Sequence, residues 1–258
     1  NMVPVPYQSA LFLLLLAPEF YAPLRQLGAD YHVKAQAEGA IAELSPLLAF
    51  ESAENTKANP FILTAPPAID ADNIWVNHQQ RTRLTPLSFA IAAGERLAIV
   101  GQSGSGKSTL LQIFLGFCAY QGDIFIDNQN FNTINSTQFR HQIAYLSQQT
   151  MLLPISIADN LRLPNPTASD DKLWQILAQV GLKPLIKALP NQLDTQLGER
   201  GSGLSGGQQR RLAIAQLLLQ DAQLWLLDEP TEHLDSDTAA EINGLLQQVT
   251  RGKTVLWV

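Results

Sequence analysis

One short segment constrains the fold of this chain more than any other feature. Residues 101–108 read Gly-Gln-Ser-Gly-Ser-Gly-Lys-Ser, which fits the pattern G-x-x-x-x-G-K-[ST]. The apolar run 97–100 precedes the segment and a run with helical character, 108–115, follows it. This strand–loop–helix context is the one that the pattern requires. The sequence therefore predicts a phosphate-binding loop in an α/β fold, with a glycine-rich turn carrying a solvated lysine as the alternative.

The residue types of this loop suit a polyphosphate. Its glycines allow positive φ, so that backbone N–H groups point at phosphate oxygens beside the positive end of the next helix. We expect Lys107 to contact the outer phosphates and the Ser108 hydroxyl to offer Mg²⁺ a hard oxygen ligand. The predicted nucleotide-binding residues of the loop are Gly101, Gln102, Ser103, Gly104, Ser105, Gly106, Lys107, Ser108 and Thr109.

The composition excludes several classes of protein. The chain has 258 residues, of which 46% are hydrophobic and 16% charged, as in globular proteins and unlike disordered, collagen-like or coiled-coil chains. A net charge of −6 gives nucleic acid no general attraction to the surface, so we expect no nucleic-acid partner. With Cys118 as its single cysteine, the chain forms no internal disulfide and no multi-thiolate metal site, which fits a reducing compartment.

A second signal, related to membranes, precedes the phosphate loop. Residues 10–17 form an apolar block that is shorter than the ~20 residues that span a bilayer as a helix. Three interpretations stay open: a signal peptide, a buried helix of a soluble protein, and the last turns of a transmembrane helix that begins before this sequence. We favour the third, because no basic residue precedes the block and no small-residue cleavage site follows it.

The pattern after this block predicts the domain organisation. Residues 19–54 place apolar side chains at helical spacing, whereas residues 51–67 collect polar residues and prolines that do not sustain a helix. We therefore predict the end of the last membrane helix and its cytoplasmic extension at 1–54, a linker at 55–67 and a nucleotide-binding domain at 68–258.

Strand-like and helix-like runs alternate from residue 69 onward, which favours a mostly parallel sheet with helices on its faces. The expected strands are residues 69–76, 87–92, 97–100, 122–127, 143–147, 224–227 and 254–258. The expected helices are residues 106–115, 169–189, 205–219 and 236–249.

A pair of carboxylates ends one of these apolar strands. Asp228 and Glu229 follow the run Leu-Trp-Leu-Leu at 224–227, so they are poised at the edge of a buried strand. We expect Asp228 to hold Mg²⁺ through its water shell and Glu229 to act as general base or to orient the attacking water. For Asp228 the alternative is a cap or turn residue.

A third motif opens a further helix. Residues 204–208 read Leu-Ser-Gly-Gly-Gln, in which Ser205 is suited to cap the helix that follows. We expect Ser205, Gly206, Gly207 and Gln208 to face the γ-phosphate of a nucleotide held by a second protomer, because the phosphate loop already serves the nucleotide of its own domain. An ordinary capped helix after a glycine turn is the alternative.

In this order, the three motifs resemble the nucleotide-binding domain of ATP-binding cassette (ABC) exporters over residues 68–258. The resemblance implies an α/β P-loop NTPase fold, with a mixed sheet core, an antiparallel β subdomain and a helical subdomain, preceded by the truncated membrane helix. It also implies ATP and Mg²⁺ as cofactors and ATP hydrolysis coupled to transport. By the same resemblance Gln148 touches Mg²⁺ and the attacking water, Leu234 and Asp235 cross a dimer interface, and residues 198–201 press against the membrane domain.

The resemblance completes the set of expected site residues. The expected catalytic residues are Lys107, Gln148 and Glu229. The expected metal ligands are Ser108, Gln148 and Asp228.

Residues 18–40 resemble the end of the last membrane helix in the CydD subunits of the CydDC family of bacterial exporters, which support cytochrome bd assembly. This implies a heterodimer with a CydC-like subunit, a transmembrane domain of its own, and the inner membrane with this domain on the cytoplasmic face. It also implies export of cysteine or glutathione, or a haem-linked role. His32 lies in this stretch, where a structural role and a ligand role are both open.

Two family features are not found where the resemblance places them. The position of the adenine-stacking aromatic residue reads Asn77-His78, with Trp75 nearby, and the sequence ends at Val258, before the switch histidine. We therefore expect this stretch alone to hydrolyse ATP slowly. Exporters of lipids or peptides are an alternative, and soluble ABC ATPases of DNA repair or translation are another, disfavoured by the apolar block, the acidic charge and the absence of room for coiled-coil arms between the motifs.

Overall fold

The computed structural model describes residues 6–48, 61–78 and 81–258 and divides into two units, Asn1–Glu54 and Asn55–Val258. The described part of the first unit is one helix, α1 (Tyr7–Leu48), whose described side chains are exposed. By length and composition, its segment Tyr7–Ser45 is able to cross a membrane. At ~1.5 Å per residue the helix is longer than the ~30 Å of a bilayer core, and it joins the apolar block and the run after it into one element.

The described part of the second unit contains an antiparallel sheet with the strand order β2-β1-β4-β5. Its strands are β1 (Ile69–His78), β2 (Arg81–Ile91), β4 (Gln121–Ile126) and β5 (Gln129–Asn130). The predicted strand 87–92 begins too late, because β2 runs through Pro86, where its pairing with β1 shifts register between Ile74 and Val76. An irregularity of this kind tolerates proline, which has no N–H for the ladder.

The second sheet is parallel and has the strand order β3-β8-β7-β6. Its strands are β3 (Arg96–Ala98), β8 (Thr254–Trp257), β7 (Leu224–Leu227) and β6 (Ile143–Leu146). Every residue of β7 is buried, which explains its continuous apolar run. Because β6 and β7 pair in parallel, the segments that follow them, with Gln148 and Asp228, leave the sheet at the same edge.

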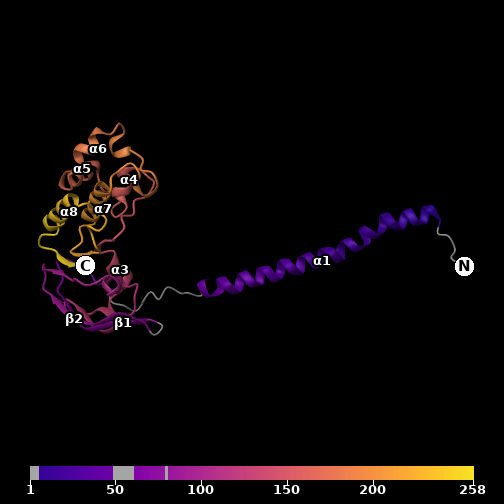
Figure 1. The fold of residues 1–258 in the computed structure, drawn as a ribbon, viewed down its shortest axis with the longest axis horizontal. Coiled ribbons are helices and arrows are strands. Elements are labelled where there is room, and N and C mark those ends of the chain that lie inside the picture. Colours follow the sequence, from indigo (N-terminus) through magenta and orange to yellow (C-terminus); the bar gives the residue numbers. More distant parts are fainter. Residues whose placement is uncertain (1–5, 49–60, 79–80) are drawn as a thin grey trace. The chain divides into compact units, whose positions relative to one another are not determined.

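Helices surround the parallel sheet and form a layer beyond it. Figure 1 shows α4, α5 and α6 at one end of this unit, the antiparallel sheet with β1 and β2 at the other, and α7 and α8 between them. The α-helices are α2 (Lys107–Phe114), α3 (Ser136–Arg140), α4 (Ile157–Arg162), α5 (Asp170–Gln179), α6 (Lys183–Ala188), α7 (Gly206–Gln220) and α8 (Ser236–Val249). The described residues also form the 3₁₀ turns η1 (Phe131–Thr133), η2 (Gln192–Asp194) and η3 (Glu199–Gly201).

The prediction of one helix over residues 169–189 is wrong. Gly181 has a φ of +74° and ends α5, with Leu182 N–H bonded to the Leu177 carbonyl at 2.8 Å and Gly181 N–H to the Ala178 carbonyl at 3.2 Å. These two bonds form a Schellman motif, which satisfies the last carbonyls of a helix. Pro184 then lies in the first turn of α6, where a proline is tolerated.

The described part of the predicted linker belongs to the second unit and is hydrogen-bonded to its other segments. Residues 49–60 lie outside the described residues, so the predicted linker is described only at 61–67. The Gln142 side chain accepts from Leu63 N–H at 2.6 Å and donates to the Phe61 carbonyl at 2.7 Å, while the Thr254 hydroxyl donates to the Pro67 carbonyl at 2.6 Å. These bonds fix the approach of the chain to β1.

Candidate active site

A cavity of ≈ 570 Å³ brings the predicted phosphate loop together with other segments of the second unit. Its lining residues are Thr82, Arg83, Ser103, Gly104, Gly106, Lys107, Ser108, Thr109, Gln148, Glu229 and Glu232. Gly101, Gln102 and Ser105 belong to the same loop without lining the cavity. Residues predicted from separate motifs, among them Gln148 and Glu229, therefore meet at one place.

The path of the loop requires its glycines. Gly104 has a φ of +79° and Gly106 a φ of +98°, values that favour glycine. A Cβ atom at Gly106 would lie 2.4 Å from the carbonyl oxygen of Arg83 in β2, which leaves no room for a side chain. Helix α2 begins at the next residue, Lys107, so that its positive end lies beside the cavity.

The Lys107 ammonium is held inside the loop. It donates to the carbonyls of Gly101 at 3.0 Å and Gln102 at 3.3 Å, and it lies 3.4 Å from Glu229 Oε1. Phosphate oxygens can replace these acceptors, because an ammonium has three donors on a flexible stem. Glu229 itself has a φ of +42°, a conformation that non-glycine residues adopt at a cost and that clusters at functional sites.

Asp228 is a buried carboxylate at the end of β7, only 5% exposed. Its Oδ1 accepts from the Ser108 hydroxyl at 3.2 Å, and its Oδ2 accepts from the Tyr145 hydroxyl at 3.3 Å. Burial, with the Asp228 charge as a further cause, raises the pKa of Tyr145 to about 12, so its phenol stays a neutral donor. Both carboxylate oxygens are thus fixed in orientation.

The oxygen donors that Ser108, Asp228 and Gln148 offer are of the kind that a magnesium ion takes. A serine hydroxyl, a carboxylate and the Gln148 amide oxygen are hard donors of the type that Mg²⁺ prefers, and Mg²⁺ bound to nucleotides takes few protein ligands beside the phosphates. Among the residues that the structure describes, no group of three or more His, Cys, Asp and Glu is arranged to hold a metal ion by itself. The donor set therefore suits a cation that arrives with phosphate oxygens.

The Gln148 amide joins two carboxylates. Its Nε2 donates to Glu229 Oε2 at 3.1 Å and also to Glu232 Oε2. Because the amide nitrogen has two protons, these two bonds use both, and the amide oxygen is left as the acceptor. Gln148 and Glu229, predicted from different motifs, are in direct contact.

Sequence reasoning missed several residues of this region, namely Thr82, Arg83, Tyr145, Arg210 and Glu232. Glu232 lies one turn beyond Glu229, to whose carbonyl its N–H bonds at 3.1 Å, and this three-residue spacing is a sequence signal that identifies it. Arg210 donates to the backbone carbonyls of Gln148 at 3.1 Å and of Glu229 at 3.2 Å. No local pattern distinguishes Arg210 from its neighbour Arg211, so only the fold reveals it.

The third motif lies elsewhere on the same unit. Ser205 and Gln208 form a capping box, in which Gln208 N–H donates to Ser205 Oγ at 3.4 Å and Ser205 N–H to Gln208 Oε1 at 2.9 Å. Ser205, Gly207 and Gln208 line a separate cavity with Arg211 and do not line the phosphate-loop cavity of their own chain. Their approach to a nucleotide therefore needs a second protomer, which stays a prediction.

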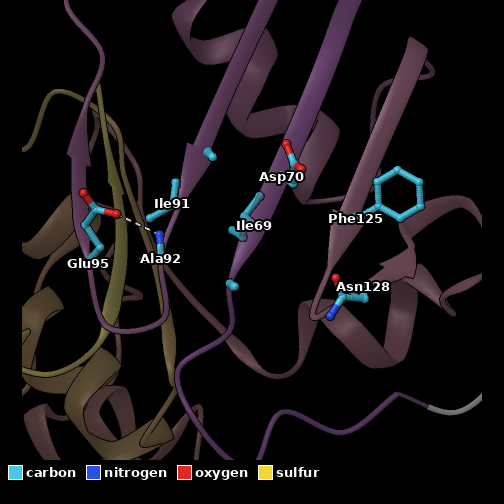
Figure 2. A pocket seen from close by; sticks show the side chains of 9 residues that line it. Ile69, Asp70, Ile91, Ala92, Glu95, Phe125 and Asn128 are labelled. Atoms are coloured by element: carbon cyan, nitrogen blue, oxygen red, sulfur yellow. Dashed lines mark hydrogen bonds between the residues drawn. The ribbon is translucent and has the colours of Figure 1, made fainter.

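A larger open cavity, of ≈ 630 Å³, lies at the antiparallel sheet and contains none of the predicted site residues. Figure 2 shows Glu95 accepting from the N–H of Ala92, with Asp70, Phe125 and Asn128 nearby. The Ala92–Glu95 bond measures 2.7 Å, so this carboxylate serves the turn before β3. The cavity offers two carboxylates and no cationic side chain among its lining residues, a charge that does not suit phosphate.

A family model described as "ABC transporter" matches residues 84–232, more than half of the chain. The chain belongs to the ABC transporter family. This confirms the predicted family and its cassette fold. ABC cassettes bind ATP and hydrolyse it to drive transport, so residues of this chain form an ATPase domain.

Relatives of this ABC domain extend beyond the cassette. The transport ATP-binding protein AarD of Providencia stuartii is 34% identical over 99% of this chain and 44% of its own length. The glutathione/L-cysteine transport protein CydD of Escherichia coli is 34% identical over 98% of this chain and 44% of its own. CydC of Escherichia coli is 43% identical over 70% of this chain and 31% of its own. The chain thus spans less than half the length of these relatives.

A solved structure supports the same family. A bacterial Atm1-family ABC exporter with ATP bound has a TM-score of 0.78 and 29% sequence identity, covering 98% of this chain and 45% of that one. Together with the family match, it confirms the predicted ABC fold class, with an antiparallel sheet, a parallel sheet and a layer of helices.

One departure from the ABC pattern is visible in the cavity. Trp75 and Asn77, from the strand where the resemblance places an adenine-stacking residue, do not line it, and the side chain of His78 lies outside the described residues. The cavity is bounded on the side of β2 by Thr82 and Arg83. These two residues stand where the phosphate loop meets the antiparallel sheet.

Proposed function

We propose that this chain is the ATP-binding and ATP-hydrolysing part of one subunit of a heterodimeric bacterial exporter of cysteine or glutathione, which supports cytochrome bd assembly. The observation that carries the proposal is the similarity to CydD over 98% of the chain, α1 included. CydC is more identical but aligns with only 70% of the chain. The extent of the match favours a CydD-like subunit, and the likeness to both proteins favours a CydC-like partner.

The contacts in the cavity support different roles for its residues in ATP binding and hydrolysis. The loop from Gly101 to Thr109 and the start of α2 bind the phosphates through N–H groups and Lys107. Glu229 orients the attacking water and accepts its proton, and Gln148 bonds to Glu229 at 3.1 Å and so aligns that carboxylate. Ser205 and its neighbours contact the γ-phosphate of the nucleotide that the facing subunit binds.

Magnesium would be held by Ser108, Asp228 and Gln148. When bound, the ion neutralises charge on the phosphate oxygens. The Ser108–Asp228 bond of 3.2 Å keeps two of these oxygen donors together, and Tyr145 fixes the other oxygen of Asp228. Roles for these residues rest on their proximity and on the chemistry of their oxygens.

The proposal places this chain in the bacterial inner membrane. We propose that residues 1–54 continue from a transmembrane domain into the cytoplasm, that 55–67 link them to the cassette, and that 68–258 form the cassette on the cytoplasmic face. The composition of α1, with a segment apolar enough to cross a bilayer, supports this arrangement. The match to a bacterial Atm1-family exporter favours a second candidate, an exporter of another substrate.

The proposal is tested by transport in inside-out membrane vesicles that carry the complete exporter with its partner subunit. Labelled cysteine, glutathione and haem are supplied with ATP, and uptake is compared with that of vesicles carrying the Glu229→Gln variant. We expect ATP-dependent uptake of cysteine or glutathione that the variant abolishes. Uptake of neither thiol, with ATP hydrolysis intact, would assign the exporter to another substrate.

A further inference from the structure

Arg210, in the second turn of α7, is a buried cation whose five N–H donors are all satisfied. Its side chain is 3% exposed. Nε donates to the Pro230 carbonyl at 2.6 Å, Nη1 to the Ser147 carbonyl at 2.6 Å and the Thr150 hydroxyl at 3.3 Å, and Nη2 to the carbonyls of Gln148 at 3.1 Å and Glu229 at 3.2 Å. A guanidinium has five donors in a rigid planar fork, so its acceptors are held in one fixed arrangement.

The acceptors belong to two segments that are distant in sequence. One follows β6 and carries Gln148, and the other follows β7 and carries Glu229. The side chains of these two residues bond to each other at 3.1 Å in front of the phosphate loop. Arg210 therefore lies behind the backbones whose side chains face the nucleotide cavity.

The chemistry of the acceptors shows that Arg210 does more than fill space. Burial of the guanidinium lowers the pKa of Arg210, and the nearby Asp228 charge opposes this change. All five hydrogen bonds go to neutral oxygens, four of them backbone carbonyls, so no carboxylate neutralises the cation by direct bonding. A buried charge with this pattern costs desolvation free energy that an apolar side chain would avoid.

We propose that Arg210 is a positioning residue of the ATPase site, which clamps the Gln148 and Glu229 backbones together and ties them to α7. This rests on the proposed function only in that the cassette hydrolyses ATP. Ser205, the cap of α7, is five residues before Arg210, a distance of ~7.5 Å along the axis. A movement of the start of α7 is thus transmitted directly to the two segments that hold the site's amide and carboxylate.

The clamp predicts a specific kinetic change. None of the bonds of Arg210 goes to the phosphate loop, so binding of ATP is not expected to depend on it. Glu229 and Gln148 are expected to lose their alignment without it, and a misplacement of about 1 Å costs ~100-fold in rate. Lysine keeps the charge but has three donors without the planar fork, so it restores the clamp only in part.

The test compares Arg210→Met, Arg210→Lys and the control Arg162→Gln in the complete exporter. Arg162 also bonds a backbone carbonyl and a neighbouring side chain, Ala168 O at 3.0 Å and Asp170, but within the layer of α4 and α5. We expect kcat to fall ~100-fold in Arg210→Met and ~10-fold in Arg210→Lys, with KM for ATP within about twofold of the wild type. The control is expected to keep the wild-type kcat.

Nucleotide binding and thermal unfolding, measured on the same preparations, separate positioning from folding. If Arg210→Met does not fold, the kcat and KM of Arg210→Lys decide. An unchanged kcat in the folded Arg210 variants, or equal changes in kcat and KM, would overturn the clamp while leaving the ATPase assignment intact. Absence of ATP hydrolysis by the wild-type exporter would instead overturn the proposed function.

Discussion

The two sides of the phosphate-loop cavity are built in different ways. The phosphate-loop side comes from one continuous segment, 101–109, whose shape follows from glycines at fixed positions and from the start of α2. The opposite side is assembled from the segments after β6 and β7, which meet through Gln148, Glu229 and Glu232 and are held by Arg210 on α7. The first side is a local structure, whereas the second exists only when the parallel sheet has formed.

This difference suggests separate tasks for the two sides. A continuous loop with backbone donors binds phosphate with little dependence on the rest of the fold. Side chains that reach the cavity from two separate segments are sensitive to small shifts of those segments. We therefore expect substitutions on the loop side to change affinity and substitutions on the opposite side to change rate.

The largest effect is expected from Glu229→Gln. Glutamine keeps the size of the side chain and a bonding partner for Gln148, but it does not accept a proton. ATP hydrolysis by the complete protein is expected to fall ~1,000-fold while ATP binding is retained. Phosphate release and binding of a fluorescent ATP analogue measure the two quantities, with Glu95→Gln as the matched control. Loss of binding together with hydrolysis would contradict the separation of tasks.

The second prediction concerns the loop side. Lys107→Ala removes a charged donor that we propose to bind phosphate oxygens, and ATP affinity is expected to fall ~100-fold. Calorimetry or equilibrium dialysis measures the dissociation constant. Lys253→Ala serves as control, because Lys253 pairs with Asp221 at 3.2 Å away from the cavity. A variant that binds ATP normally and fails only in hydrolysis would place Lys107 on the rate-determining side.

A smaller effect is expected from substitution of Glu232, on the opposite side of the cavity. Glu232→Ala removes one of two carboxylates that share the Gln148 amide, and kcat is expected to fall about fivefold, with Glu232→Gln nearer to wild type because its amide oxygen still accepts. A double-mutant cycle with Gln148→Ala measures the coupling, expected at about 1 kcal/mol. Additive effects of the two substitutions would show that the Gln148–Glu232 contact is irrelevant to hydrolysis.

The smallest effect is expected from Tyr145, whose hydroxyl donates to Asp228. The pKa of Tyr145 is about 12 in the fold and about 10 when unfolded, so the fold favours the neutral phenol. Its contribution to stability is complete below pH 10 and is lost as the pH rises from 10 to 12. Tyr145→Phe is expected to flatten the pH dependence of unfolding in this range and to cost about 1 kcal/mol at pH 8.

Denaturant unfolding at pH 8 and pH 11 measures both effects. Tyr120, whose pKa is also raised to about 12 by burial with a further contribution from Asp123, remains as an internal reference in the variant. An unchanged alkaline loss of stability in Tyr145→Phe would show that the Tyr145–Asp228 bond contributes little.

The same distinction between a local side and an assembled side explains which parts of this molecule the sequence predicts. Glycine spacing and the apolar run before it located the loop, and the unbroken apolar run 224–227 located β7, because each pattern reports on consecutive residues. The break at Gly181 was missed because apolar spacing continues across it, although the glycine and Pro184 are signals of a helix end. The full length of β2 was missed because proline is rare inside strands.

The residues of the opposite side show the limit more clearly. The family resemblance placed Gln148, but its contact with Glu232 depends on the turn after Glu229, and the bonds of Arg210 depend on how α7 packs behind two strand ends. Neither set of contacts leaves a periodic pattern in the sequence. Charged residues in a helix are usually assigned to its solvent face, and the buried Arg210 is an exception that packing alone decides.

The position of β8 in the parallel sheet affects how the chain folds during its synthesis. This strand lies between β3 and β7, and Gly94 N–H bonds to the hydroxyl of Thr254, 160 residues further along. During synthesis β3 leaves the ribosome long before the strand that pairs with it, so its backbone waits unpaired while the intervening helices emerge. Such distant pairing slows folding and leaves time for association between nascent chains.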